Sequence, residues 1–157
     1  MRHCNLEDKS PRGEIASGFL MTSSNAHEPL EAGPSDLSGL RVLVVEDSWH
    51  VGTAMKSLLR AWGADVVGPV ATTADAVRLI SEQVPDVALV DLNLRGGELA
   101  YGLIDRLHGQ GIRVVVTSGY ADTLLASGKA AAILQKPVNE AQLLASLRPV
   151  TTDKAAL

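Results

Sequence analysis

Short apolar runs alternate with segments of helical periodicity throughout the chain after residue 39. The apolar runs span residues 41–46, 65–70, 86–90, 112–117 and 132–135. An unbroken run such as Val42–Val45 suits a strand that is buried on both faces. Between the runs, apolar residues recur three or four positions apart, which is typical of helices with one buried face. The first of these helical segments follows Asp47 and includes Val51 to Trp62, and the others lie near residues 73–84, 99–108, 121–127 and 139–147.

Strands that alternate with helices predict an α/β fold, in which helices cover both faces of a parallel sheet. Right-handed crossovers leave few topologies, and the flavodoxin-like strand order 2-1-3-4-5 is the commonest at this size. We therefore predict a doubly wound, five-stranded parallel sheet with five helices. Ligands of such sheets bind beyond the carboxyl ends of the strands, where the winding reverses between the first and third strands.

Several helix ends carry capping signals. Gly63 suits the C-terminal stop of the first helix, and Thr73 suits the N-cap of the second. Asn139 can cap the last helix, with Gln142 placed to reach back to it. The positions that we expect on the buried faces of the first three helices include Val51, Val84 and Leu99.

Composition divides the 157-residue chain into three parts. Residues 1–38 have no sustained period and are rich in Ser, Pro, Gly and Ala, so we expect a flexible extension. Residues 39–148 form the predicted domain, and residues 149–157 a C-terminal tail without a fused output domain. Of the 18 acidic and 14 basic residues, six and three lie within 1–38, which leaves the domain close to neutral.

The chain has few features that suit a membrane, a disulfide or a nucleic acid. No apolar run approaches the roughly 18 residues that a membrane helix needs. The single cysteine, Cys4, cannot form an internal disulfide, so a reduced cytoplasmic setting is expected. The near-neutral domain has no basic stripe and few aromatic residues, which argues against nucleic-acid binding.

Polar side chains that could take part in catalysis or metal binding follow four of the predicted strands. Because the carboxyl ends of parallel strands meet at one edge of the sheet, we expect these side chains to gather there. They are Glu46 and Asp47 after the first strand, Asp91 after the third, Thr117 and Ser118 after the fourth, and Lys136 after the fifth.

Three carboxylates at one edge would repel one another unless a cation lay between them. Oxygen ligands without a Cys/His cluster favour a hard divalent ion, Mg²⁺ or Mn²⁺. An aspartate that lies beside such an ion, with a lysine opposite, can attack a phosphoryl group and form an acyl phosphate. The ion and Lys136 would neutralise the phosphoryl oxygens, and Ser118 could donate a hydrogen bond to them.

The motifs VVEDS, VALVDLN, VVVTSGY and LQKP, in this order and spacing, resemble the receiver domain of two-component response regulators. The resemblance covers residues 40–147. It implies that Asp91 is the phosphoacceptor and that Asp47 binds the metal directly, with Glu46 acting mainly through a metal-bound water. The backbone carbonyl of Asn93 would complete the protein ligands.

The same resemblance implies roles on the fourth and fifth strands. Ser118 matches the switch hydroxyl, Lys136 the phosphate-contacting lysine, and Pro137 the proline that follows that lysine in a cis peptide. The chain departs from the common pattern at Ile133, where many receivers have Tyr or Phe. We therefore expect switching to run through Ser118, Tyr120 and the segment 119–130, which phosphorylation would order.

The resemblance also indicates partners. No proline follows Asn93, and the chain has a Gly-rich loop at that point instead. Together with the TSGY motif, this loop makes the chain similar to receivers that are paired with histidine kinases of the HWE or HisKA2 type. The leading interpretation is a single-domain response regulator, which is no turnover enzyme. It would accept a phosphoryl group on Asp91 from a histidine kinase or phosphotransfer protein and signal by contact with a downstream protein.

Three other functions remain open at this point. A phosphatase of the haloacid dehalogenase type carries Asp-x-Asp on its first strand, whereas here the acceptor follows the third strand and Asn93 stands two residues later. A flavodoxin-like electron carrier needs a hydroxyl- and Gly-rich loop where this chain has EDSWH. A receiver-like module that is not phosphorylated would have no use for the pairing of Asp91 with Lys136.

Overall fold

A five-stranded parallel sheet forms the centre of the domain. The computed structural model describes residues 37–120 and 128–155. The strand order is β2-β1-β3-β4-β5, and every neighbouring pair is parallel. The predicted sheet and its order are therefore confirmed, and each strand lies within one residue of its expected bounds. The strands are β1 (Arg41–Val45), β2 (Asp65–Val70), β3 (Val87–Asp91), β4 (Arg113–Ser118) and β5 (Ala132–Gln135).

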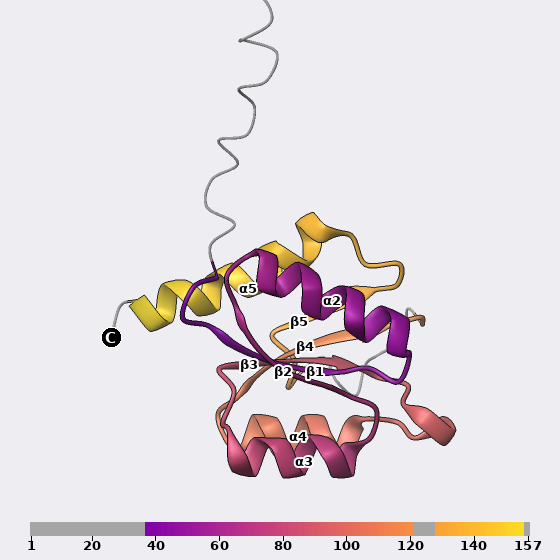
Figure 1. Ribbon diagram of the computed structural model, residues 1–157. Coiled ribbons are helices and arrows are strands. Elements are labelled where there is room, and N and C mark those ends of the chain that lie inside the picture. The colour runs from indigo at the N-terminus through magenta and orange to yellow at the C-terminus, as the bar shows by residue number, and fades with distance from the viewer. Residues whose placement is uncertain (1–36, 121–127, 156–157) are drawn as a thin grey trace, which may run out of the picture. The chain divides into compact units, whose positions relative to one another are not determined.

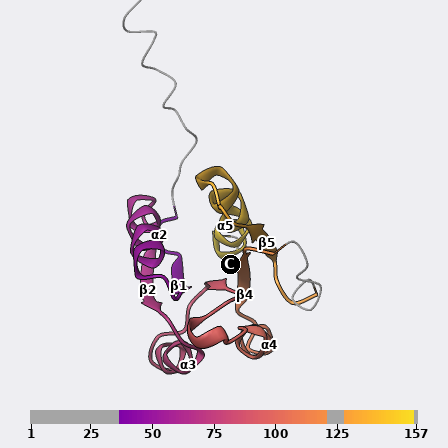
Figure 2. The ribbon, with the colours of Figure 1, turned by 90° about the vertical axis from the view of Figure 1, so that its right-hand side faces the viewer.

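Helices cover both faces of this sheet. Helices α2 and α5 lie on one face, and α3 and α4 lie on the other (Figures 1 and 2). Their bounds are Trp49–Ala61 for α2, Thr73–Glu82 for α3, Tyr101–Gly109 for α4 and Glu140–Ala155 for α5. These are four of the five predicted helices; the remaining one, at 121–127, lies outside the described residues. None of the helices in the described ranges is long and apolar enough to cross a membrane.

Two capping predictions are confirmed and one is wrong. Gly63 follows the end of α2 with a φ of 91°, and Asn139 Oδ1 accepts a 2.8 Å hydrogen bond from the backbone N–H of Gln142. The N-cap of α3 is Thr72 rather than Thr73: its hydroxyl accepts from the N–H of Asp75 at 3.1 Å. An N-cap residue needs an extended backbone, which Thr72 has, whereas Thr73 is already helical.

Helices α3 and α4 are shorter than their apolar patterns predicted. Val84 is 65% exposed because α3 ends at Glu82; Pro85 disfavours a helical backbone at the residue before it. Leu99 is 51% exposed and precedes α4, since its backbone pairs with Asn93 in an isolated antiparallel bridge. Helix α5 continues to Ala155, so its last turns include most of the segment that we predicted as a tail.

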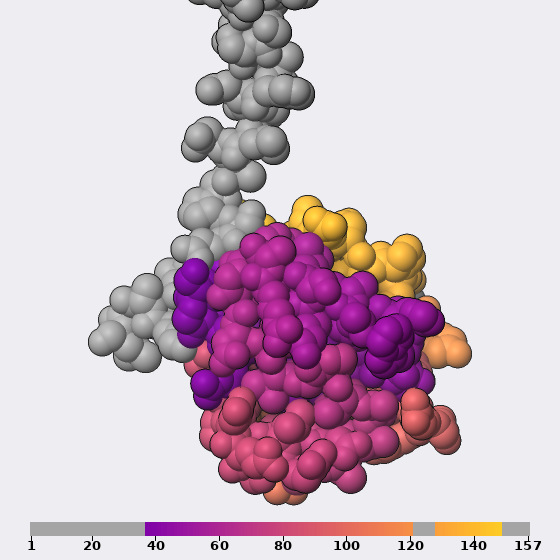
Figure 3. Space-filling view, viewed as in Figure 1, coloured from indigo at the N-terminus to yellow at the C-terminus, as the bar shows by residue number. Residues whose placement is uncertain are grey.

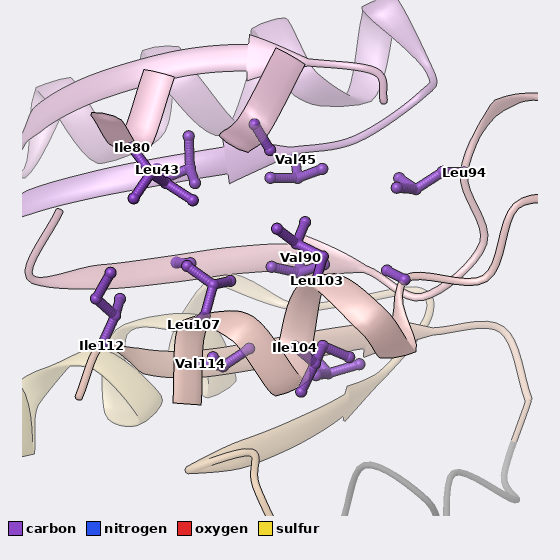
Figure 4. Close-up of a cluster of buried hydrophobic side chains, with 14 of the residues drawn as sticks. Leu43, Val45, Ile80, Val90, Leu94, Leu103, Ile104, Leu107, Ile112 and Val114 are labelled. Carbon is purple, nitrogen blue, oxygen red and sulfur yellow. The ribbon is translucent and has the colours of Figure 1, made fainter. Parts of the chain in front are cut away.

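The hydrophobic core has two halves, one on each face of the sheet. Successive strand residues point to opposite faces, so Leu43 and Val45 pack toward α3 and α4, whereas Val42 and Val44 pack toward α2 and α5. Figure 4 shows the first half, in which Leu103 of α4 meets the sheet. All five residues of β3 are buried, as expected for a central strand.

Helix α2 buries its predicted stripe except at its first turn, because Met55, Leu58 and Trp62 pack against the core together with Leu59. Val51 is 38% exposed, whereas Gly52 and Leu59 are buried. Gly52 lies against Pro69 at the end of β2, and a Cβ atom added to it would stand 2.9 Å from the Cβ of Pro69. The missing side chain therefore lets this end of the helix approach the sheet, and Val51 is turned toward the surface.

Candidate functional site

The side chain of Lys136 joins two buried carboxylates at the carboxyl edge of the sheet. Its Nζ lies 2.8 Å from Oδ2 of Asp91 and 3.3 Å from Oε2 of Glu46. Both acidic residues are 4% exposed, and they follow or end the central strands β1 and β3. The predicted gathering of these three side chains is confirmed, because parallel strands bring their carboxyl ends to one edge.

Asp47 completes a group of three carboxylates. One oxygen each from Glu46, Asp47 and Asp91 can be chosen so that all three lie within 4.8 Å of one another. A single ammonium group, from Lys136, offsets only part of this negative charge. Carboxylate oxygens at this separation suit a hard divalent cation such as Mg²⁺, so the residues present fit the ion that the sequence predicts.

Glu46 is held through both of its carboxylate oxygens. Oε1 accepts a 3.1 Å hydrogen bond from the backbone N–H of Ser48, and Oε2 contacts the ammonium of Lys136. Burial raises the pKa of Glu46 above its usual value, and the negative charge of Asp91 raises it further. The hydrogen bond from Ser48 and the positive charge of Lys136 lower the pKa but do not cancel the effect of burial. The net result is a carboxylate that ionises less readily than in water.

The charge of Lys136 is maintained by its acidic partners. Partial burial alone would lower the pKa of the ammonium group. The hydrogen bond to Asp91, together with the charges of Glu46 and Asp91, outweighs that effect and raises the pKa above its usual value. The lysine therefore stays protonated beside Asp91 at neutral pH.

Asn93 lies beside Asp91 at the start of the Gly-rich loop. Its backbone N–H donates a 3.1 Å hydrogen bond to Oδ1 of Asp91. The neighbouring Leu94 is 2% exposed and anchors the loop in the core, and its N–H donates to the carbonyl of Glu98. The short helix η1 (Arg95–Gly97) projects beyond this anchor, at the edge of the domain in Figure 3. The anchor thus orients Asn93 next to the site.

Ser118 and Tyr120 are linked to each other. The buried hydroxyl of Ser118 accepts a 3.1 Å hydrogen bond from the backbone N–H of Tyr120, whose side chain is 68% exposed. Ile133 of β5 is partly buried against the core beneath α3 and α4. The peptide between Lys136 and Pro137 is cis, as predicted. The rest of the predicted switch segment, 121–127, lies outside the described residues.

The sequence interpretation missed Ser48. It is the N-cap of α2, and its hydroxyl accepts from the N–H of Val51 at 3.5 Å while its own N–H holds Glu46. A serine just before a helical pattern is a recognisable N-cap signal, which could have identified the capping role. The bond to Glu46, however, depends on how the chain turns between β1 and α2.

An apolar groove adjoins the carboxylates, between α2 and the segment that joins β5 to α5. Its volume is about 540 Å³. His50 and Lys136 line it together with side chains from both elements, and apolar groups dominate the lining. The apolar residues are Val51, Ala54, Met55, Leu58, Pro137, Val138 and Leu143. Val51, which was expected in the core, thus contributes to an open surface beside the site.

Comparison with known proteins places this geometry in a family. The family model described as "Response regulator receiver domain" matches residues 42–148. The signal receiver domain of a modulated diguanylate cyclase from Desulfovibrio desulfuricans G20 is 27% identical, with a TM-score of 0.66; the match covers 74% of this chain and 97% of that one. A CheY-like receiver domain from Methylobacillus flagellatus is 26% identical, with a TM-score of 0.64 and coverages of 71% and 98%. No curated protein matches.

Proposed function

The chain belongs to the response regulator receiver domain family, and from this we propose that it accepts a phosphoryl group on Asp91 and signals through protein contacts. One observation carries the proposal: Oδ2 of Asp91 lies 2.8 Å from the ammonium of Lys136 within a group of three carboxylates. A half-buried lysine opposite an aspartate suits the binding of a phosphoryl group, because it offsets the charge of the group that arrives.

The proposed step is an in-line phosphoryl transfer. A carboxylate oxygen of Asp91 attacks the phosphorus atom of a phosphohistidine, forming a P–O bond while the P–N bond breaks and the electron pair stays on the imidazole nitrogen. Lys136, already within hydrogen-bond distance of Asp91, stabilises negative charge on the phosphoryl oxygens. The hydroxyl of Ser118 then turns from Tyr120 and donates a hydrogen bond to the phosphoryl group.

The acidic group has a separate role in this proposal. Asp47, Asp91 and the backbone carbonyl of Asn93 would hold a Mg²⁺ or Mn²⁺ ion, with Glu46 acting through a water molecule, and the ion would supply positive charge toward the phosphoryl oxygens. Asp47 is more exposed than Glu46, which is 4% exposed, and this supports a direct position for Asp47 and an outer one for Glu46.

Receiver domains take their phosphoryl group from histidine kinases, and we propose a kinase or a phosphotransfer protein as the donor. The groove beside Lys136 supports this, because an apolar surface next to the acceptor can seat a helix of the donor. The finer assignment to HWE or HisKA2 kinases rests on the TSGY motif and the loop after Asn93. Signalling by contact with a downstream protein and a location in the cytoplasm are likewise predictions from the sequence.

The haloacid dehalogenase-type phosphatase is the principal alternative, and the site favours the receiver over it. The second residue after the nucleophile is Asn93, which has no proton to give as a general acid. Its backbone N–H instead holds the carboxylate of Asp91. A receiver-like module that is never phosphorylated would not need the Asp91–Lys136 contact.

The deciding experiment is incubation with acetyl phosphate and Mg²⁺, followed by intact mass measurement. We expect one phosphoryl group per chain, none after chelation of the metal, and none in Asp91→Asn. Asp105→Asn, an exposed acidic residue of α4, is the matched control and should label like the parent protein. Steady release of phosphate without a stable adduct would favour the phosphatase, and labelling that survives Asp91→Asn would refute the proposed acceptor.

A further inference from the structure

The side chain of Lys136 has to cross a strand to reach its partner. Lys136 follows β5, and its backbone N–H donates to the carbonyl of Ser118 in β4 at 2.8 Å. Its ammonium group nevertheless contacts Asp91, at the end of β3, and β4 lies between these two strands. Neighbouring strands are about 4.8 Å apart, so the two side chains together span roughly two strand spacings. The lysine stem therefore lies over β4.

Thr117 is the side chain of β4 beneath this path. It is in register with Asp91 on one side and with Leu134, two residues before Lys136, on the other. Residues in register on parallel strands point to the same face, and Val115, two residues earlier, packs beneath α2 and α5. Ser118 alternates to the other face, and Gly119 has no side chain.

The size and burial of Thr117 suit this position. The residue is 1% exposed, whereas the Lys136 side chain is 32% exposed. Threonine has the shape of the valines before it in β4, and its branched Cβ restricts it to few rotamers. A longer side chain at this point would lift the lysine stem away from the sheet.

We propose that Thr117 is a positioning residue: its short, branched side chain supports the Lys136 stem across β4 and so directs the ammonium to Asp91. The consequence for phosphoryl transfer rests on the proposed function, but the placement of the lysine does not. The sequence places Thr117 at the end of the fourth strand but does not indicate this role, because the role arises from the register of three strands.

The test compares Thr117→Leu and Thr117→Ile with Thr117→Val, which keeps the shape of threonine. Val115→Ile is the matched control, because it enlarges a buried residue on the same strand and face, away from the lysine. The first measurement is the rate at which acetic anhydride modifies Lys136, relative to Lys129 in the same molecule. The second is the initial rate of labelling by acetyl phosphate and Mg²⁺. Thermal melting confirms that each variant is folded.

We expect Thr117→Leu to increase Lys136 modification and to slow labelling about tenfold or more, as when a hydrogen bond to a charged group is lost. Thr117→Ile should change Lys136 modification and labelling in the same direction but less. It tests the role of Thr117 if the leucine variant does not fold. Thr117→Val should restore both measurements, and Val115→Ile should change neither. Unchanged Lys136 reactivity in folded Thr117→Ile and Thr117→Leu would overturn the inference. If the parent protein takes up no phosphoryl group, the proposed function fails, while the reactivity of Lys136 still decides the role of Thr117.

Discussion

Among single residues, Glu46 and Asp91 both have partners within the protein for each of their carboxylate oxygens. For Glu46 these are the N–H of Ser48 and the ammonium of Lys136, and for Asp91 the N–H of Asn93 and the same ammonium. Asp47 is more exposed, and its oxygens can turn toward a cation within the acidic group. Adjacent acids in the sequence can therefore serve different roles, one as a direct ligand and the other through water.

This difference predicts a ranking of metal affinities. Asp47→Asn should weaken Mg²⁺ binding more than Glu46→Gln, because only the first removes a charged direct ligand. Trp49, which is 70% exposed and two residues from Asp47, should report binding through its fluorescence. The reverse ranking in the fluorescence titration would show that the two roles are exchanged.

The raised pKa of Glu46 predicts a pH effect on the metal-free protein. A carboxyl group whose pKa is higher in the folded state than in the unfolded state stabilises the fold when it is protonated. Its ionisation therefore lowers the free energy of unfolding as the pH rises from the usual pKa of 4.5 through the raised pKa of the folded state. Glu46→Gln removes that cost. Urea denaturation in the presence of a chelator should show the variant gaining stability relative to the parent protein between acidic and neutral pH. A difference that is constant with pH, or that shrinks toward neutral pH, would contradict this.

At the scale of elements, α4 contributes some of the most deeply buried side chains of the domain. Leu103 is 1% exposed and packs between the helix and the sheet (Figure 4). We expect Leu103→Ala to lower the free energy of unfolding by about 2–5 kcal/mol, through lost burial and a residual cavity. Val84→Ala, at a 65% exposed site, is the control and should cost much less in urea denaturation. Equal losses would mean that α4 does not pack as described.

The link between β4 and the following segment predicts how the domain switches. The hydroxyl of Ser118 now accepts from the N–H of Tyr120, so a turn of that hydroxyl toward a phosphoryl group would change the start of segment 119–130. With a beryllium fluoride mimic bound, we expect amide exchange to slow across 119–130 and to change little around Ile133. A response confined to β5 would show that switching follows the route of receivers with an aromatic residue at that position.

At the scale of the whole molecule, the apolar groove and the acidic group share Lys136. A protein seated in the groove would therefore touch the residue that contacts the acceptor. Ala54 is exposed and lines the groove, so Ala54→Glu should weaken transfer from the donor protein by placing a charge against an apolar partner. Labelling by acetyl phosphate, which needs no groove, should be unaffected.

Ser57→Glu is the matched control for this prediction, because Ser57 is exposed on the same helix but does not line the groove. Phosphotransfer from the cognate kinase should be normal in that variant. If Ala54→Glu also accepts phosphoryl groups from the kinase at the parental rate, the donor docks elsewhere.

The sequence by itself determined the strands, their order and the residues at their carboxyl ends. Apolar runs and helical periods are local patterns, and right-handed crossovers restrict how such elements connect. Once the strands are parallel, Glu46, Asp91 and Lys136 must meet at one edge of the sheet. The central residues of the site therefore follow from the alternation of strands and helices along the chain. The C-terminal stop at Gly63 and the N-cap at Asn139 were equally predictable, because capping involves near neighbours in the chain.

Only the tertiary structure decided how the elements face one another. The first turn of α2 packs through Gly52 against Pro69 in another element, and Val51 lines an open groove instead of the expected core. The register that sets Thr117 opposite Asp91 on one side and Leu134 on the other is likewise a relation among three strands. Such contacts join residues that are distant in sequence, and packing rather than local pattern selects them.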